Sequence, residues 1–164
     1  TRKWVQSQDS ENYRRGLYVY WRRSVPYASF VTFDAPSRET CTVKRPRTNT
    51  PLQALVLMND PVFLEAARSF GERIIRDGGA TVVDRVRFAF RTGLGRMPTD
   101  EEQQRVIRAY ETEFENFLKN RSDANQLIHV GATPPRTEID PVELAAWTMV
   151  AQVLLNLDET ITKG

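Results

Sequence analysis

Charged and amide side chains are concentrated in one stretch of the sequence, between residues 34 and 60. The candidate binding residues there are Asp34, Arg38, Glu39, Arg45, Arg47, Asn49, Asn59 and Asp60, and Gln53 lies among them. Arginine side chains bind a carboxylate, sulfate or phosphate group through paired hydrogen bonds. Two of the acids could instead form the carboxylate pair that glycoside cleavage requires for general acid–base catalysis. A third interpretation is that these groups cap helices and pair with one another.

Spacing in the sequence does not show that any two of these carboxylates meet, so no catalytic residue is assigned. We adopt the interpretation that the polar groups organise the local structure, while binding of an anion or glycan and catalysis stay open. Cys41 and His129 are the chain's single cysteine and histidine. This excludes an internal disulfide and a two-histidine metal motif, so no metal site is predicted. We expect Cys41 to be buried, and His129 to cover open carbonyl groups at a helix end.

Two predicted helix starts follow one another within this polar stretch. Pro51 and Pro61 each suit the first helical position, where a missing N–H group costs nothing. Thr50 and Gln53 have the spacing of a capping box, and Asp60 fits the N-cap before Pro61. A rigid local structure is therefore expected here, rather than a plain connector.

Apolar residues recur at helical spacing along most of the chain, and strand signals are nearly absent after residue 43. Helices are predicted over about 13–23 (narrowly favoured over a strand), 51–58, 61–77, 81–92, 100–119, 123–129 and 141–156. The predicted fold class is all-α, a single-domain helical bundle of about five or six helices over residues 1–164. Residues 1–49 are expected to form an extended, aromatic- and Arg-rich N-terminal arm with loops, and residues 50–164 the helical core.

Charge is unevenly distributed along the chain. Residues 1–50 hold ten Lys or Arg against four Asp or Glu, although the net charge of all 164 residues is only +2. We expect this basic segment to pair with the acidic remainder of the chain or with a neighbouring protein, and not with nucleic acid. Its aromatic residues, from Trp4 to Phe30, fit a protein interface or a platform that stacks on sugars. The sequence contains no apolar run long enough to span a membrane.

Several separate motifs are similar to one family. They are residues 13–18, 20–23, 32–36, 38–43, 48–61, 95–99 and 154–159. Together they resemble the planctomycete-type domain of unknown function numbered fifteen fifty-three, over essentially the whole chain. The resemblance implies the C-terminal part of a domain that ends large exported proteins, periplasmic or extracellular, which often carry a cytochrome-c-like haem domain. The chain is then a fragment of a longer protein. Since it lacks the haem attachment motif, we expect no cofactor in this chain and any haem in an upstream domain.

The expected function is that of an uncharacterised helical scaffold or interaction domain of a larger exported protein. Its partner would be the upstream domain of the same protein or another protein, and we lean against enzymatic activity for this chain alone. In the alternative, the chain forms part of a binding or catalytic cleft for an extracellular polysaccharide, including a sulfated one. This cleft would use the polar residues between Asp34 and Asp60. The first function predicts an exposed apolar patch around residues 4–33. The second predicts a hollow that holds at least two of Asp34, Glu39 and Asp60.

Overall fold

The computed structural model describes residues 13–22 and 25–162 of the chain. These residues form eight α-helices and no β-strand, which confirms the predicted all-α class. The helices are α1 (Ala28–Thr32), α2 (Pro51–Asn59), α3 (Pro61–Asp77), α4 (Val82–Gly93), α5 (Asp100–Lys119), α6 (Arg121–Ile128), α7 (Pro141–Leu155) and α8 (Asp158–Ile161). Their number exceeds the expected five or six because the sequence pattern does not predict the short helices α1 and α8. Over the described ranges, no helix is long and apolar enough to cross a membrane.

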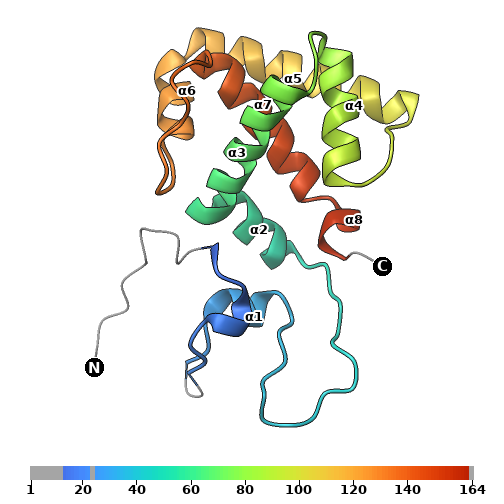
Figure 1. The fold of residues 1–164 in the computed structure, drawn as a ribbon, viewed down its shortest axis with the longest axis vertical. Helices are drawn as coiled ribbons and strands as arrows, with labels where there is room; N and C mark the ends of the chain where they lie inside the picture. The colour runs from blue at the N-terminus through green and yellow to red at the C-terminus, as the bar shows by residue number, and fades with distance from the viewer. Residues whose placement is uncertain (1–12, 23–24, 163–164) are drawn as a thin grey trace.

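Helix α7 lies at the centre of the helical body, and α3, α5 and α6 pack around it (Figure 1). It is apolar on nearly all sides, as expected for a helix with neighbours on every face. Trp147 is completely buried there, and its ring stacks on that of Tyr110 from α5 with 4.6 Å between the ring centroids. A Cβ atom added to Gly71 of α3 would lie 3.2 Å from the amide nitrogen of Thr148. The missing side chain of Gly71 therefore permits the close crossing of α3 and α7.

The helix starts follow the predicted caps. Thr50 and Gln53 form a reciprocal capping box at α2, and the Asp60 carboxylate caps α3. A second capping box joins Thr99 and Glu102 at α5. These bonds satisfy amide groups that have no partner within their own helix. The bounds of α2, α3 and α5 consequently agree with the predicted ones to within one residue.

The N-terminal arm, which we define as residues 13–22 and 25–49, contains little regular structure. A helix over 13–23 is not formed in the described part, where only Gly16–Tyr18 make a 3-10 turn. A glycine at residue 16 disfavours a helix interior, and the ring of Trp21 stacks on Phe30 of α1. Residues 1–12, with Trp4, lie outside the described residues. The arm occupies the end of the molecule opposite α4, α5 and α6 (Figure 1).

Three burial predictions are wrong, and the prediction for His129 is confirmed. Cys41 is exposed, because the loop after α1 runs over the surface. Helical spacing also predicts Ala66 of α3 and Leu118 of α5 on the buried faces of their helices, but both are exposed, since neighbouring positions of the same helices take the inward faces. Nδ1 of His129 lies 2.7 Å from the carbonyl oxygen of Asn125, one turn earlier, so the imidazole covers a carbonyl at the end of α6.

Candidate functional site

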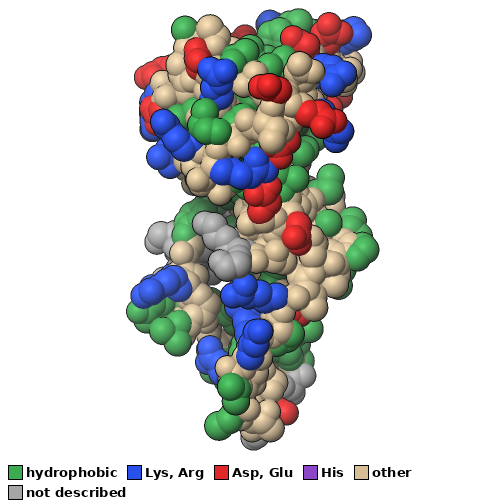
Figure 2. All heavy atoms as spheres, turned by 90° about the vertical axis from the view of Figure 1, so that its right-hand side faces the viewer, with side chains coloured by type: hydrophobic (Ala, Val, Ile, Leu, Met, Phe, Trp, Pro, Cys, Tyr) green, Lys and Arg blue, Asp and Glu red, His purple; other side chains and the backbone are tan. Residues whose placement is uncertain are grey.

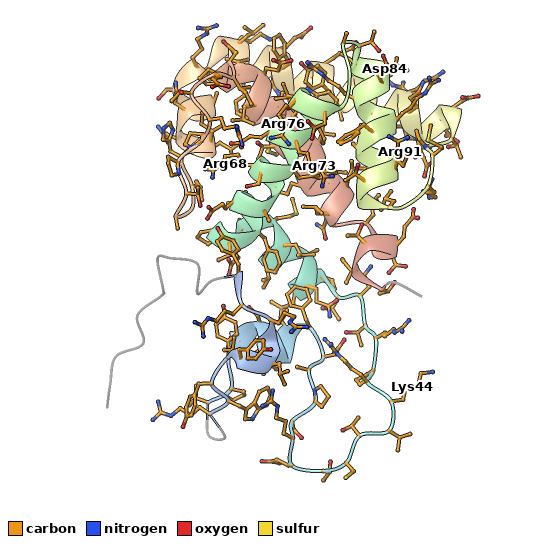
Figure 3. All side chains as sticks on the ribbon, in the orientation of Figure 1. Lys44, Arg68, Arg73, Arg76, Asp84 and Arg91 are labelled. Carbon is orange, nitrogen blue, oxygen red and sulfur yellow. The ribbon has the colours of Figure 1, made fainter. Side chains whose placement is uncertain are left out.

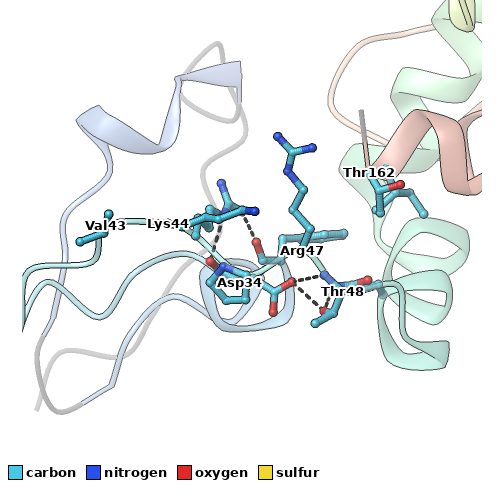
Figure 4. A pocket seen from close by; sticks show the side chains of 11 residues that line it. Asp34, Val43, Lys44, Arg47, Thr48 and Thr162 are labelled. Carbon is cyan, nitrogen blue, oxygen red and sulfur yellow. Dashed lines mark hydrogen bonds between the residues drawn. The ribbon is translucent and has the colours of Figure 1, made fainter. Parts of the chain in front are cut away.

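A hollow of about 500 Å³ lies where the N-terminal arm meets the C-terminal end of the chain (Figure 4). Its walls come from Phe33 and Asp34 after α1, from the strip Val43–Thr48, and from Ile161 and Thr162 at the end of α8. The hollow thus joins segments that are more than a hundred residues apart in the sequence. Of the three acids considered for a carboxylate pair, only Asp34 lines it.

The carboxylate of Asp34 is occupied by the chain itself. One of its oxygens accepts hydrogen bonds from the amide nitrogen of Thr48 at 2.9 Å and from the hydroxyl of Thr48 at 2.6 Å. The bond from the Thr48 side chain, above all, lowers the pKa of Asp34 below its ordinary value. Gln53 extends the network, because its amide group donates to the Thr48 hydroxyl and to the carbonyl of Thr32. Asp34 therefore holds the loop in place and is not free to act on a ligand.

The cations of the same hollow differ in their partners. Nε of Arg45 donates to the carbonyl oxygen of Asp34 at 2.8 Å, and Nη2 donates to that of Phe33. Within the described part of the chain, Lys44 and Arg47 make no hydrogen bond or ion pair, and Figure 4 shows Arg47 extending without any marked contact. Carbonyl groups orient the Arg45 guanidinium, and its charge also acts on the Asp34 carboxylate and helps to lower the pKa of that group. The hollow consequently presents three cations to solvent against the single carboxylate of Asp34.

The other predicted residues lie elsewhere or serve the backbone. Asn59 donates to the carbonyl of Leu55 within α2, and Asp60 caps α3. The Nδ2 atom of Asn49 donates to the Asp158 carboxylate of α8 at 2.8 Å. The side chain of Glu39 is exposed in the loop after α1. The structure therefore brings Asp34, Arg45 and Arg47 together, and it does not bring Glu39, Asn59 or Asp60 to them.

A second hollow, of about 460 Å³, adjoins the first and shares Phe33 and Arg45 with it. Apolar groups of Leu17, Trp21 and Phe30 line it. The Trp21 ring stacks on that of Phe30 with 5.3 Å between centroids, and the guanidinium carbon of Arg38 lies 5.1 Å from the centroid of Trp21. Arg38 thus takes part in a cation–π contact and belongs to this apolar hollow instead of the charged one.

Sequence reasoning missed several residues of these hollows. Lys44 stands in a cationic strip that is visible in the sequence and could have been included. Ile161 and Thr162 give no such signal, because only the fold brings the end of the chain to residues 33–48. Figure 3 shows Lys44 on the outer side of the arm, far from the labelled arginines of the body.

A buried charged cluster in the helical body was also not predicted. Glu65 and Arg68 of α3 are almost inaccessible to solvent. Both oxygens of Glu65 accept amide hydrogen bonds from the α6–α7 loop at 2.9 Å, from Ala132 and Thr133. Arg68 donates to the carbonyl of Ile128 at the end of α6 at 2.6 Å and to that of Thr133 in the loop at 2.7 Å. The signal in the sequence is a charged pair within the apolar stripe of a helix, and the pair fastens the loop.

Arg96 joins the α4–α5 connector to α8. Its guanidinium makes paired hydrogen bonds with Glu102 of α5 and with Glu159 of α8. These bonds lower the pKa of Glu102 to about 2, with Arg96 as the main cause. Two of the motifs used for the family resemblance, residues 95–99 and 154–159, therefore meet in an ion-pair network that supports the fold.

Comparison with known proteins gives a family but no activity. No curated protein and no solved structure matches the chain. The planctomycete origin, the association with cytochrome c and the extension of the resemblance to residues 154–159 stay predictions. A family model described as PSD1, protein of unknown function (DUF1553), matches residues 1–110, so the chain belongs to that family.

Proposed function

We propose that this chain is a helical interaction domain that packs on another protein domain through its N-terminal arm and α2. The observation that carries the proposal is the placement of exposed apolar side chains. Among the described residues, most large hydrophobic side chains that face solvent lie between Tyr13 and Met58, and beyond these only Met97, Leu118 and Val153 do so. Apolar surface of this kind is usual where another protein binds.

Helix α2 gives the sharpest example. Leu52, Leu55 and Met58 follow one another at every third position, on one face of the helix. About half or more of each side chain is accessible, at 59%, 58% and 48%. A helix with an apolar face that nothing covers is destabilised in water unless a partner buries that face. A protein surface is the simplest partner for a stripe of leucine and methionine side chains.

The charges of the arm fit the same interpretation. Figure 2 shows Lys and Arg side chains over the lower half of the molecule, whereas the helical body above carries both signs of charge intermixed. Arginine and aromatic residues are enriched in the centres of protein interfaces. An arm of this composition favours a partner with apolar and acidic groups. An upstream domain of the same protein, which the family resemblance implies, fits this description as well as a separate protein does. Export and the absence of a cofactor here stay predictions.

Site-specific photo-crosslinking in the full-length natural protein tests the proposal. A photoreactive residue replaces Leu55 on the exposed face of α2, and a control replaces Glu111 on the exposed side of α5. We expect the Leu55 probe to form a crosslink to one defined protein segment, identified by mass spectrometry, and the Glu111 probe to form none. Equal and diffuse crosslinking from both positions, or none from Leu55, would contradict the proposal.

Binding of an anionic polysaccharide is a second candidate, favoured by the cationic hollow at Lys44, Arg45 and Arg47. Catalytic cleavage of such a polysaccharide lacks support, since Asp34 is the only one of Asp34, Glu39 and Asp60 that lines the hollow. A ligand that binds the folded state raises the melting temperature. Stabilisation of the full-length protein by an anionic glycan, abolished by Arg47→Ala, would favour this candidate; no stabilisation would exclude it.

A further inference from the structure

We propose that the two adjoining hollows of the arm form one composite site for a peptide segment in which a bulky apolar side chain stands beside carboxylates. The proposal rests on the proposed function and specifies the chemistry of the partner. Both hollows have volumes, about 500 and 460 Å³, within the range of ligand sites in proteins. They share Phe33 and Arg45, so one ligand can occupy both.

The cationic half of the site favours an anion. Lys44 and Arg47 have no hydrogen bond or ion pair with the described residues, whereas Arg45 donates its hydrogen bonds to carbonyl groups and its charge acts on Asp34. The one carboxylate in this half, that of Asp34, is bound by Thr48. A carboxylate brought by a ligand would therefore pair with Lys44 and Arg47, which have no partner among the described residues.

The apolar half of the site determines which kind of side chain can bind beside the anion. Leu17 and Phe30 line it, and the guanidinium of Arg45 stands between this half and the cationic one. A side chain such as Leu or Phe would bury apolar surface there and would place the next residue along its chain near Arg45. A peptide segment with an apolar residue beside acidic residues thus fits both halves of the site.

A peptide fits this site better than a glycan or a single-stranded nucleic acid. The bases of a single-stranded nucleic acid stack on an open aromatic face, and so do the rings of many bound sugars. The ring of Trp21 is instead already stacked on Phe30 and lies under the Arg38 guanidinium. Apolar aliphatic and aromatic groups dominate the second hollow, whereas sugars and phosphates would leave it unfilled.

Selection from a library of short random peptides, displayed and captured on the full-length natural protein, tests the site. We expect enrichment of peptides that carry an apolar residue next to Asp or Glu. The Lys44→Gln/Arg47→Gln double variant should lose the acidic enrichment, and Leu17→Ser should lose the apolar preference. The control Arg91→Gln/Lys119→Gln removes the same number of exposed charges from the helical body and should select the same peptides as the unaltered protein.

An enriched peptide is then measured by fluorescence anisotropy. The Lys44→Gln/Arg47→Gln variant should bind it about threefold to tenfold more weakly, as expected for two exposed charge pairs. No acidic enrichment, or equal enrichment on this variant, overturns the composite site. Tighter binding of a sulfated polysaccharide than of any selected peptide also overturns it. If the Leu55 probe still crosslinks to a protein in that case, only the assigned chemistry fails and the proposed function stands.

Discussion

The helical body and the N-terminal arm differ in how their charged side chains are used. In the body, arginines such as Arg68, Arg85 and Arg96 lie against carboxylates or carbonyls that the fold supplies. In the arm, Lys44 and Arg47 have no such partner among the described residues. Burial follows the same division, since no described residue between Tyr13 and Leu52 is fully buried. The body therefore carries the stability of the chain, and the arm keeps groups available for another molecule.

The strongest test of this comparison replaces one tryptophan in each region. Trp147→Ala should lower the free energy of unfolding by about 3–5 kcal/mol, because a fully buried indole leaves a cavity in the core. Trp21→Ala should cost about 1 kcal/mol or less, since Trp21 is only partly buried, between Phe30 and Arg38. Urea unfolding followed by circular dichroism measures both. Equal losses would mean that the arm contributes to the core.

The pH dependence of folding stability provides a second test, through Glu65. Burial raises the pKa of Glu65, but hydrogen bonds from Thr133, Ala132 and Tyr13 outweigh this and lower it from 4.5 to about 2. Because the folded state holds the lower pKa, the stabilisation is complete above about pH 5 and is lost as the pH falls towards 2. Glu65→Gln should lower stability at neutral pH by about 2–4 kcal/mol.

The same variant should unfold with a shallower dependence on pH over the acid range. The dependence should not vanish, since Glu102 has a pKa of about 2 as well. Glu111→Gln, at an exposed position of α5, is the control and should change neither quantity. An unchanged acid profile for Glu65→Gln would show that this carboxylate does not fasten the loop.

Gly131 and Gly95 form a matched pair for the next effect. Both have positive φ angles, +111° and +76°. A Cβ atom on Gly131 would lie 2.5 Å from a carboxylate oxygen of Glu65, whereas one on Gly95 would meet nothing within 4 Å. Gly131→Ala should therefore cost about 1–3 kcal/mol, and Gly95→Ala should cost less, because backbone strain acts alone there. Thermal unfolding of the two variants separates the cost of backbone strain from the cost of the clash between the added Cβ atom and Glu65.

Asn49 tests the contact between the arm and the end of the chain. Its bond to Asp158 is exposed, so Asn49→Ala should lower stability by about 1 kcal/mol. A double-mutant cycle with Asp158→Ala isolates the pair. Additive losses from the two substitutions would mean that the bond contributes nothing in solution.

The smallest effect is expected for the cations of the hollow. Lys44→Gln and Arg47→Gln should each change the free energy of unfolding by no more than about 0.5 kcal/mol, because neither side chain has a partner to lose. The comparison is Arg96→Gln, which breaks contacts with both Glu102 and Glu159 and should cost more. A marked loss for Arg47→Gln would place this arginine among the structural charges of the body.

Capping residues and apolar spacing, which act over a few positions, made the helices predictable. The hollows have no such short-range pattern and were not predicted. Pro61 and Asp60 set the start of α3 through groups one or two positions away, so its bounds follow from the sequence. The sequence of residues 13–23 carries no capping signal, and its aromatic residues fit a helix only narrowly better than a strand. The hollow at residues 43–48 depends on Ile161 and Thr162, which only tertiary packing brings there. The choice between paired and unpaired arginines likewise depends on geometry that a sequence does not contain.

The short helix α8 carries two attachments on successive residues. Asp158 accepts the hydrogen bond from Asn49, and Glu159 binds Arg96. One turn of backbone thus links the base of the arm to the α4–α5 connector, although these segments lie nearly fifty residues apart. Fraying of that turn would release both ends together. Native-state hydrogen exchange should consequently find the amides around Asn49 and Arg96 opening as a single cooperative unit.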